Sequence, residues 1–360
     1  YFEFNAVGRE AMDRLEGLVK AGYPPGLAAL LLKEAEQIAV RVYLLDNSKS
    51  TLTQDGHVLA GDVYQSTTRW EEIKAMTLQQ AELAALTGVP AEFFILNPGA
   101  RNPAPVEDHD FIRIDPAVGD PKVQMGKLVS MMLENDPQVR NGSNLSARLG
   151  NIGQRLDALQ LNGRTVMLVV VCDGAPRAAR VGGTTDKDRK QFVDVLRQMS
   201  LSYRMYIVVR LCTDEEKEVQ FYNEVDQEAE LPMDIIDDIV GEAKEIHEAG
   251  NRWFAYSPAL HRCREAGMVS PLFDAIDERQ LAPPEISMFS ALLLGNTTPV
   301  TVPREPTEVL PVVEEALKTS CPVWDPLTQR RVAPIDKKEL AKALPAPAKK
   351  SMFSLFSSKK

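Results

Sequence analysis

The sequence has no long hydrophobic run and no excess of positive charge. None of its apolar stretches approaches the ~20 residues of a membrane-spanning helix, and its formal net charge is −10. A nucleic-acid-binding protein usually carries a basic face, so this charge balance argues against that class. With 44% hydrophobic and 26% charged residues, the composition is typical of a soluble globular protein. We therefore expect a soluble cytoplasmic protein that binds no nucleic acid.

Cysteine and histidine are also scarce, with four of each in 360 residues. The cysteines are far apart and form no C-x-x-C pair; they are Cys172, Cys212, Cys263 and Cys321. This spacing argues against a zinc site and against a disulfide framework. Cys172 and Cys212 close apolar runs, which predicts reduced, buried thiols. The sequence likewise lacks the G-x-x-x-x-G-K-[ST] pattern of a phosphate-binding loop.

The most informative stretch of the sequence is 39–51, which reads AVRVYLLDNSKST. Val40–Leu45 is a short apolar run of the kind that forms a buried strand. It is followed by Asp46, Ser48 and Ser50, which place a carboxylate and two hydroxyls on alternating positions of a loop. Hard oxygen donors of this kind suit a small divalent cation. The same residues also suit a plain turn that caps a helix, and the loop alone leaves both interpretations open.

A second strand ends in the same way. Val166–Cys172 is the most apolar run in the sequence, and it leads into Asp173. A fully apolar strand is typical of the buried centre of a parallel sheet. Because ligands of such sheets bind beyond the carboxyl ends of the strands, we expect Asp46 and Asp173 at one edge. The loop before the expected helix 145–159 adds Ser143, which predicts a helix cap with an outward hydroxyl.

The order of elements predicts the fold class. Strands alternate with amphipathic helices, which indicates an α/β fold with a doubly wound, mostly parallel central sheet flanked by helices, as in Rossmann-like proteins. Further strands are expected at 92–96 and 110–114, which form a hairpin with an edge strand, at 204–211, and at the last edge, 253–256. We divide the chain into a helical cap at 1–37, an α/β domain with additional acidic helices at 38–296, and a proline-rich extension with a basic tail at 297–360.

Three motifs in this order resemble the von Willebrand factor A (vWA) domain. They are D-x-S-x-S at 46–50, a Gly-Ser loop at 142–143 before a helix, and Asp-Gly at 173–174 after a later strand. The resemblance covers 38–211, and in that family these segments form the metal-ion-dependent adhesion site (MIDAS). It implies a Mg²⁺ ion, or Mn²⁺ or Ca²⁺ in its place, held by Asp46, Ser48, Ser50, Ser143 and Asp173. It also implies that a protein partner supplies an acidic side chain to the open coordination position.

Two residues depart from the family pattern. Lys49 stands where the family usually has glycine, and Thr51 replaces a hydrophobic residue. An inward lysine would oppose a cation, whereas an outward lysine would attract an acidic partner. A metal-free interaction module with the same fold is therefore an alternative. A phosphatase with an aspartate nucleophile is another, but Ser48 occupies the position where such enzymes need a second carboxylate. We expect a binding or scaffold module without catalytic residues.

Charge divides the C-terminal part of the sequence. Residues 213–248 contain fourteen acidic side chains against two lysines, a local charge of −12, with apolar residues at helical spacing. They predict two amphipathic helices with solvated outer faces, or alternatively a docking face for a basic partner or Ca²⁺. From 297 onward nine prolines favour irregular structure, with short helices at 309–317 and 337–344. The final segment, 335–360, carries a net charge of +5 and predicts a solvated tail, or alternatively a weak contact with an anionic membrane.

Overall fold

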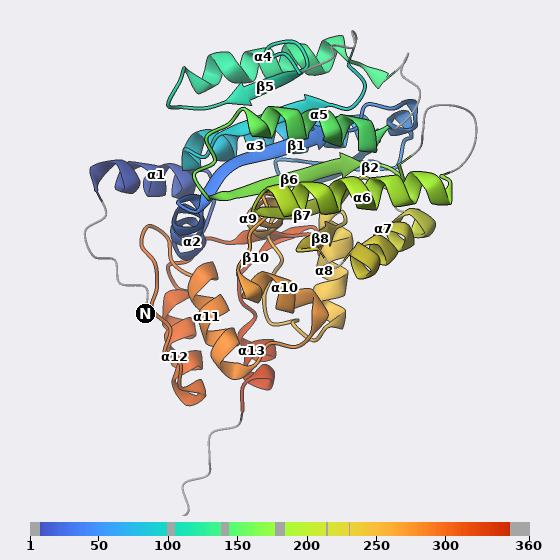
Figure 1. Ribbon diagram of the computed structural model, residues 1–360. Coiled ribbons are helices and arrows are strands. Elements are labelled where there is room, and N and C mark those ends of the chain that lie inside the picture. Colours follow the sequence, from blue (N-terminus) through green and yellow to red (C-terminus); the bar gives the residue numbers. More distant parts are fainter. Residues whose placement is uncertain are drawn as a thin grey trace, which may run out of the picture.

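The computed structural model describes residues 8–98, 105–137, 144–176, 184–213, 215–229 and 231–345. Its centre is a six-stranded sheet with the strand order β5-β4-β1-β6-β7-β8 (Figure 1). All neighbouring strands pair in parallel except β5, which pairs antiparallel with β4 at one edge. The strands are β1 (Ile38–Leu45), β4 (Ala91–Ile95), β5 (Phe111–Ile114), β6 (Thr165–Cys172), β7 (Met205–Leu211) and β8 (Met233–Ile236).

Helices cover both faces of this sheet, because its central strands are apolar on both sides. Every residue of β1 is buried, and so is every residue of β6 after Thr165. One face packs against α5 (Leu145–Asp157), α6 (Asp186–Ser202) and α7 (Glu216–Ala229), and the other against α3 (Arg69–Thr87) and α4 (Pro121–Glu134) (Figure 1). The predicted α/β class with a mostly parallel sheet between helices is confirmed, and the arrangement is compatible with a Rossmann-like fold.

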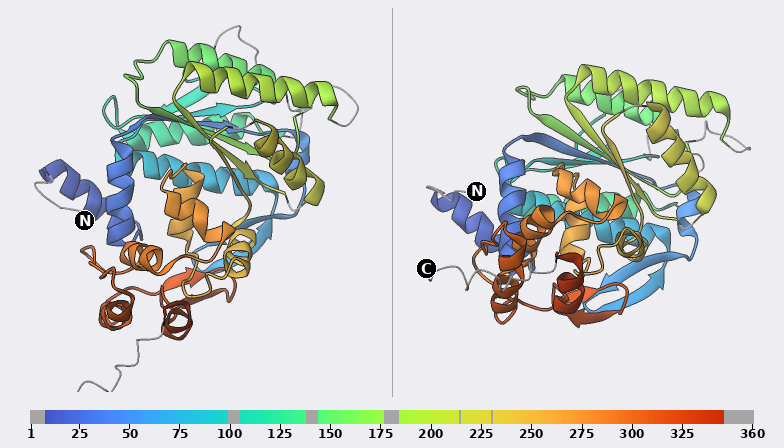
Figure 2. Two further views of the ribbon diagram at one scale, coloured as in Figure 1. Left: turned by 60° about the horizontal axis from the view of Figure 1, so that its bottom comes forward. Right: turned by 90° about the horizontal axis from the view of Figure 1, so that it is seen from below.

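A second hydrophobic core is formed mainly by helices that lie below the sheet in the view of Figure 1, and Figure 2 shows these helices from two other sides. It joins helices from the two ends of the described chain. They are α1 (Arg9–Lys20), α2 (Pro25–Ala35), α8 (Ile239–Glu248), α9 (Pro258–Glu265), α10 (Pro271–Glu278), α11 (Pro283–Leu293), α12 (Pro306–Ala316) and α13 (Lys337–Ala343). Several of them begin with proline, whose missing N–H would have no partner at that position anyway.

Helices α2 and α11 meet backbone to backbone in this core. Gly26 lies so close to α11 that a Cβ atom in its place would collide with the carbonyl of Ala291. Leu27 beside it is fully buried, as is Phe289 on the facing helix. The N-terminal helices and the C-terminal helices are therefore packed as one unit.

The C-terminal segment differs from its sequence prediction. The sequence predicts a solvated tail from Ile335, yet Ile335, Leu340 and Leu344 are buried in the second core. Phe254 forms an isolated antiparallel bridge with Ile335, and no longer strand forms among the described residues at 253–256. The expected helices at 309–317 and 337–344 are present as α12 and α13. Residues 346–360, which carry the rest of the basic tail, lie outside the described residues.

Strand β8 also departs from the sequence prediction. Ile235 and Ile236 fit a helical spacing within the acidic stretch, and the sequence therefore predicts a helix there. In the structure, Ile207 to Arg210 of β7 pair with Met233 to Ile236 instead, which adds a strand to the sheet edge. The flanking helices α7 and α8 form as predicted. Periodicity alone cannot distinguish a four-residue strand from a turn of helix, because both place apolar residues close together.

Two short hairpins were not expected from the sequence. Strands β2 (Gly56–Ala60) and β3 (Val63–Thr67) pair antiparallel across a two-residue turn, in which Gly61 has a φ of 63°. Glycine adopts this left-handed conformation without steric cost. The second hairpin consists of β9 (Val323–Asp325) and β10 (Arg330–Val332).

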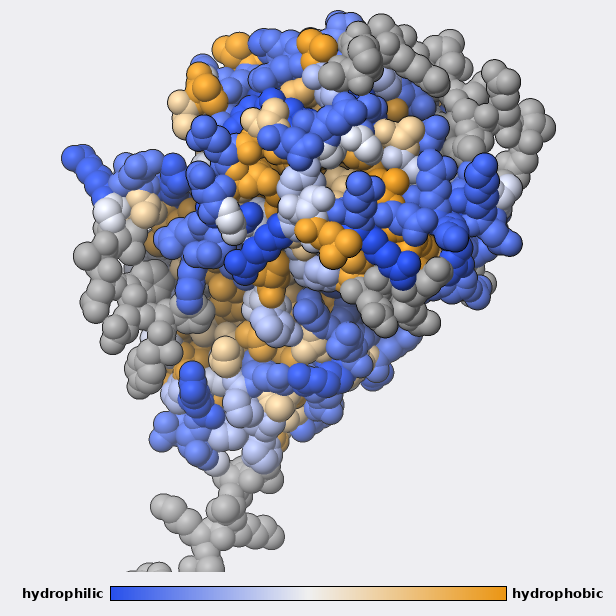
Figure 3. Space-filling model, viewed as in Figure 1, coloured by the Kyte–Doolittle hydropathy of each residue, from blue (hydrophilic) through white to orange (hydrophobic). Residues whose placement is uncertain are grey.

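Hydrophilic side chains cover most of the face shown in Figure 3, and hydrophobic side chains form smaller patches among them. Among the described residues, no helix has both the length and the apolar character needed to cross a membrane. All four cysteines are free, and Cys172 and Cys212 are buried, as the sequence predicts. Burial raises the pKa of the Cys172 thiol, so this group stays protonated and inert.

Candidate functional site

The carboxyl ends of β1 and β6 bring Asp46 and Asp173 to one edge of the sheet. The two strands are parallel neighbours, with Leu45 opposite Val171. The backbone N–H of Asp46 donates a 2.9 Å hydrogen bond to the carbonyl of Val171, so the pairing extends to the aspartate itself. The prediction that both carboxylates lie at the same edge is confirmed.

A continuous series of hydrogen bonds connects four of the five residues expected in the site. The backbone N–H of Ser48 donates to Oδ1 of Asp46 at 2.7 Å. The hydroxyls of Ser48 and Ser50 lie 2.9 Å apart, and the Ser50 hydroxyl donates to Oδ1 of Asp173 at 3.0 Å. Asp46, Ser48 and Asp173 are buried, whereas Ser50 is exposed. The group thus opens to solvent on the side of Ser50.

The fifth expected residue, Ser143, lies outside the described residues. The sequence also predicts that Ser143 caps the following helix. In the structure the N-cap of α5 is Asn144, whose side-chain oxygen accepts a 3.1 Å hydrogen bond from the backbone N–H of Ala147. Asparagine and serine are equally good N-caps, so residue type could not decide between these neighbours.

The two departures from the family pattern fit the loop without strain. Lys49 is exposed and begins the short 3₁₀ helix η1 (Lys49–Leu52). It is not among the described non-glycine residues with positive φ, so its position does not require glycine. Thr51 is buried, and its hydroxyl donates to the carbonyl of Ser48 at 2.8 Å. This hydrogen bond fixes the turn that carries both serines.

Asn47 ties the loop to its neighbours. It is fully buried, and its side-chain N–H₂ donates to the carbonyls of Asn97 at 3.1 Å and Asn135 at 2.8 Å. Its side-chain oxygen accepts from the backbone N–H of Asn97 at 2.9 Å. These bonds join the end of β1 to the end of β4 and to the end of α4. The loop is therefore held in place by the protein itself.

Arg69, the first residue of α3, is a charged residue of the site that the sequence does not predict. Its guanidinium is 3% exposed and lies 3.3 Å from Oδ2 of Asp173. It also donates two hydrogen bonds of 2.7 Å to the carboxylate of Asp55 and lies 3.5 Å from Glu215. The hydrogen bonds between Arg69 and Asp55 raise the pKa of the guanidinium above its ordinary value. The same bonds are the main cause that lowers the pKa of the Asp55 carboxyl group. Arg69 is thus a permanent cation within the site.

Sequence reasoning missed Arg69, although the sequence contains a signal for it. The pair Thr68 and Glu71 predicts the start of α3, and Thr68 does accept a hydrogen bond from the backbone N–H of Glu71. This start places an arginine in the first helical turn, where the helix dipole disfavours positive charge. Acidic partners from elsewhere in the fold offset this unfavourable interaction, and the structure supplies Asp55 and Asp173.

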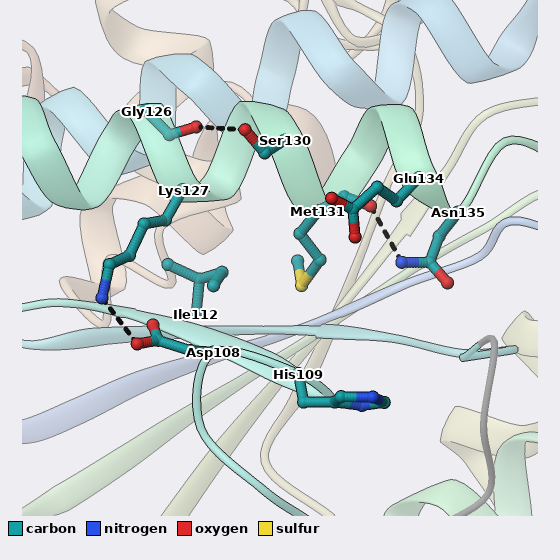
Figure 4. A pocket seen from close by; sticks show the side chains of 9 residues that line it. All are labelled: Asp108, His109, Ile112, Gly126, Lys127, Ser130, Met131, Glu134 and Asn135. Atoms are coloured by element: carbon teal, nitrogen blue, oxygen red, sulfur yellow. Dashed lines mark hydrogen bonds and ion pairs between the residues drawn. The ribbon is translucent and has the colours of Figure 1, made fainter.

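A pocket of about 650 Å³ lies between α4 and the segment that leads into β5 (Figure 4). Asn135, which accepts the hydrogen bond from Asn47, is part of its wall. On another side the Lys127 ammonium pairs with Asp108 at 2.5 Å. The remaining lining residues are His109, Ile112, Gly126, Ser130, Met131 and Glu134. The pocket is therefore lined by side chains of both charge signs and by some apolar side chains.

The donor set at the strand ends fits a small divalent cation. Asp46 and Asp173 supply carboxylates, and Ser48 and Ser50 supply hydroxyls, all within one hydrogen-bonded group. Hard cations such as Mg²⁺ and Mn²⁺ prefer oxygen donors of this kind, whereas zinc favours sulfur and nitrogen. The residues present therefore fit the predicted ion.

A second acidic group lies on α8 and α10. Glu242, Glu245 and Asp277 are close enough to surround an ion. However, the guanidinium of Arg264 pairs with Glu242 and, at 2.6 Å, with Asp277. An arginine already supplies the positive charge there, so the geometry is that of a buried ion-pair network.

Neither protein-family models nor curated proteins give a match to this chain. The residues and their geometry are therefore the basis for inferring a function. The group formed by Asp46, Ser48, Ser50 and Asp173 is the most informative feature, because it joins segments far apart in the sequence.

Proposed function

We propose that this protein is a vWA-type binding module that holds a divalent cation at the carboxyl edge of its sheet. Asp46, Ser48, Ser50 and Asp173 would hold the ion, with Ser143 as the fifth ligand implied by the family resemblance. The bound ion would supply a positive centre for the carboxylate of a protein partner. Magnesium is the expected ion, with Mn²⁺ or Ca²⁺ as substitutes.

One observation carries this proposal: the side-chain oxygens of Ser48, Ser50 and Asp173 form a chain of hydrogen bonds, and the backbone N–H of Ser48 joins the Asp46 carboxylate to it. Ser50 donates to Asp173 at 3.0 Å and lies 2.9 Å from Ser48. Without a cation, an incoming carboxylate would meet two carboxylates at this edge and be repelled. A divalent ion changes the sign of that interaction, which is why the proposed partner binds through the metal.

The exposed ammonium of Lys49 supports the same class of partner. Lys49 precedes Ser50 in the chain and is exposed, so its positive charge is available to an acidic side chain that approaches the loop. Interactions of this kind act mainly on the rate of association and weaken as salt is added.

A metal-free interaction module is the second candidate, and Arg69 favours it. The guanidinium already lies 3.3 Å from Asp173 and neutralises part of the acidic charge. In this alternative the loop and the fold serve as a rigid surface for a partner, and no ion takes part. The two candidates differ in one measurable property, which is the affinity for divalent cations.

Calorimetric titration with Mg²⁺ and Mn²⁺ separates them. The proposal predicts a single binding event for the natural sequence and its loss in Asp46→Ala. Asp194→Ala is the matched control, because Asp194 is an exposed aspartate on α6 away from the strand ends. Binding should persist in this control. If the natural protein shows neither heat of binding nor thermal stabilisation at millimolar Mg²⁺ and Mn²⁺, the metal-dependent function is wrong.

A further inference from the structure

Arg69 connects three acidic residues from three separate segments of the chain. Asp55 precedes β2, Asp173 follows β6, and Glu215 follows β7. The guanidinium is buried, whereas the carboxylates of Asp55 and Glu215 are 35% and 46% exposed. Arg69 therefore lies between the proposed site on one side and solvent-facing acids on the other.

The contacts of Arg69 are unequal. Both oxygens of Asp55 accept hydrogen bonds of 2.7 Å, which is the paired geometry in which arginine binds carboxylates most strongly. Asp173 is held by one nitrogen at 3.3 Å, and Glu215 lies at 3.5 Å. The contact with Asp173 is consequently one that can change while Asp55 keeps the arginine in place.

Asp173 divides its two oxygens between Arg69 and the serine loop. Oδ1 accepts the hydrogen bond from Ser50, and Oδ2 faces Arg69. An ion among the serine hydroxyls would therefore share this carboxylate with a guanidinium. Each cation lowers the negative charge available to the other, and the two cations repel across a short distance within a buried region.

We propose that Arg69 is an internal competitor that weakens divalent-cation binding at this site by sharing Asp173. This inference rests on the proposed function and adds its regulation. Asp55 sets the strength of the competition, because it draws the guanidinium away from Asp173. Loss of the Arg69 charge should tighten cation binding, and loss of the Asp55 charge should weaken it.

Two substitutions with opposite expected effects test this inference. Arg69→Gln removes the charge and keeps a hydrogen-bond donor; the affinity for Mg²⁺ should rise by about tenfold or more. Asp55→Asn leaves Arg69 with fewer acidic partners, so the guanidinium should bind Asp173 more tightly and the affinity for Mg²⁺ should fall severalfold. Calorimetry and the shift of the melting temperature with Mg²⁺ measure both effects on the full chain. The double variant Arg69→Gln/Asp46→Ala should bind no Mg²⁺, which locates the gained affinity at this site.

The outcomes separate the inference from the proposed function. If the natural protein binds Mg²⁺ with the same affinity as both single variants, Arg69 is no competitor and only the inference fails. If Arg69→Gln does not fold, an unchanged affinity in the milder variant Asp55→Asn still overturns the inference. If the natural protein does not bind and Arg69→Gln does, the metal-dependent function of the natural protein fails, whereas the inference that Arg69 opposes cation binding at this site holds. If none of the three proteins binds Mg²⁺ or Mn²⁺, both proposals fail.

Discussion

Ser50 and Asp173 are 123 positions apart in the chain, and a 3.0 Å hydrogen bond joins their side chains. The first lies on the loop after β1, and the second follows β6. Their contact exists because the two strands are adjacent and parallel, so the residues that follow them emerge at the same edge.

Removing the Ser50 hydroxyl should abolish most cation binding with little effect on folding. We expect Ser50→Ala to lower the affinity for Mg²⁺ at least tenfold, because one proposed ligand and the bond to Asp173 are lost. The free energy of unfolding should change by less than about 1 kcal/mol, since the side chain is exposed. Ser202→Ala is the control: this exposed serine on α6 should change neither quantity. Unchanged Mg²⁺ affinity in Ser50→Ala would remove Ser50 from the site.

The charge of Lys49, and not its backbone, should limit cation binding. Its φ is not positive, so glycine offers no conformational advantage there. We therefore expect Lys49→Gly and Lys49→Gln to tighten Mg²⁺ binding to a similar extent, by about twofold to fivefold for an exposed charge. Titrations at low and high salt should show the difference from the natural protein shrinking as salt is added. A gain restricted to the glycine variant would instead indicate a strained backbone at this position.

Glu34 should make the protein less stable as the pH rises. Burial raises the pKa of this carboxyl group from 4.5 to about 7, with an opposing hydrogen bond from the backbone N–H of Val269. Between these two values the unfolded chain ionises Glu34 while the folded chain resists ionisation, so stability falls from about pH 4.5 to pH 7 and then levels off. Glu34→Gln should therefore gain about 1–2 kcal/mol at pH 8 relative to the natural protein and almost nothing near pH 4.5.

Urea unfolding of both proteins at pH 5 and pH 8 measures this difference. Glu36→Gln provides the control, because Glu36 is exposed at the end of the same helix. A stability gain for Glu34→Gln that is equal at both pH values would show that ionisation of Glu34 is not the cause.

The segment after Ile335 should contribute to stability. Leu340 is fully buried in the second core, so Leu340→Ala should cost about 2–4 kcal/mol in the free energy of unfolding. Lys342→Ala on the exposed side of the same helix should cost less than about 0.5 kcal/mol, although Lys342 pairs with Glu339. Thermal melting distinguishes the two variants. Equal melting temperatures for both would mean that α13 does not pack as described.

The sequence was informative where residues act through simple local rules. The apolar runs before Asp46 and Asp173 predict central parallel strands, and the structure confirms both the strands and the shared edge. Thr68 and Glu71 likewise mark the start of α3 correctly. In these cases burial on both faces or a cap is encoded within a few consecutive residues.

Sequence reasoning failed where the structure depends on contacts between distant segments. Arg69 is the first residue of α3, where positive charge is disfavoured, but the residues around it do not show that its partners are Asp55 and Asp173. Ile335 lies in a lysine-rich, proline-flanked stretch, and only its place among the helices of the second core explains its burial. Strand β8 similarly depends on pairing with β7, which its own spacing does not reveal.

The backbone contact between α2 and α11 has a practical consequence for dissecting the protein. Because Gly26 leaves no room for a side chain against Ala291, the backbones of α2 and α11 are in close contact at this point. A fragment trimmed to the α/β part would expose the apolar surface that packs against these helices in the full chain. Aggregation on expression is the expected result. Fragments 1–37 and 38–360 would each expose one side of the same surface, so they should be expressed together, and they are then expected to reassociate in trans. The chain is therefore better suited to split-protein complementation than to truncation.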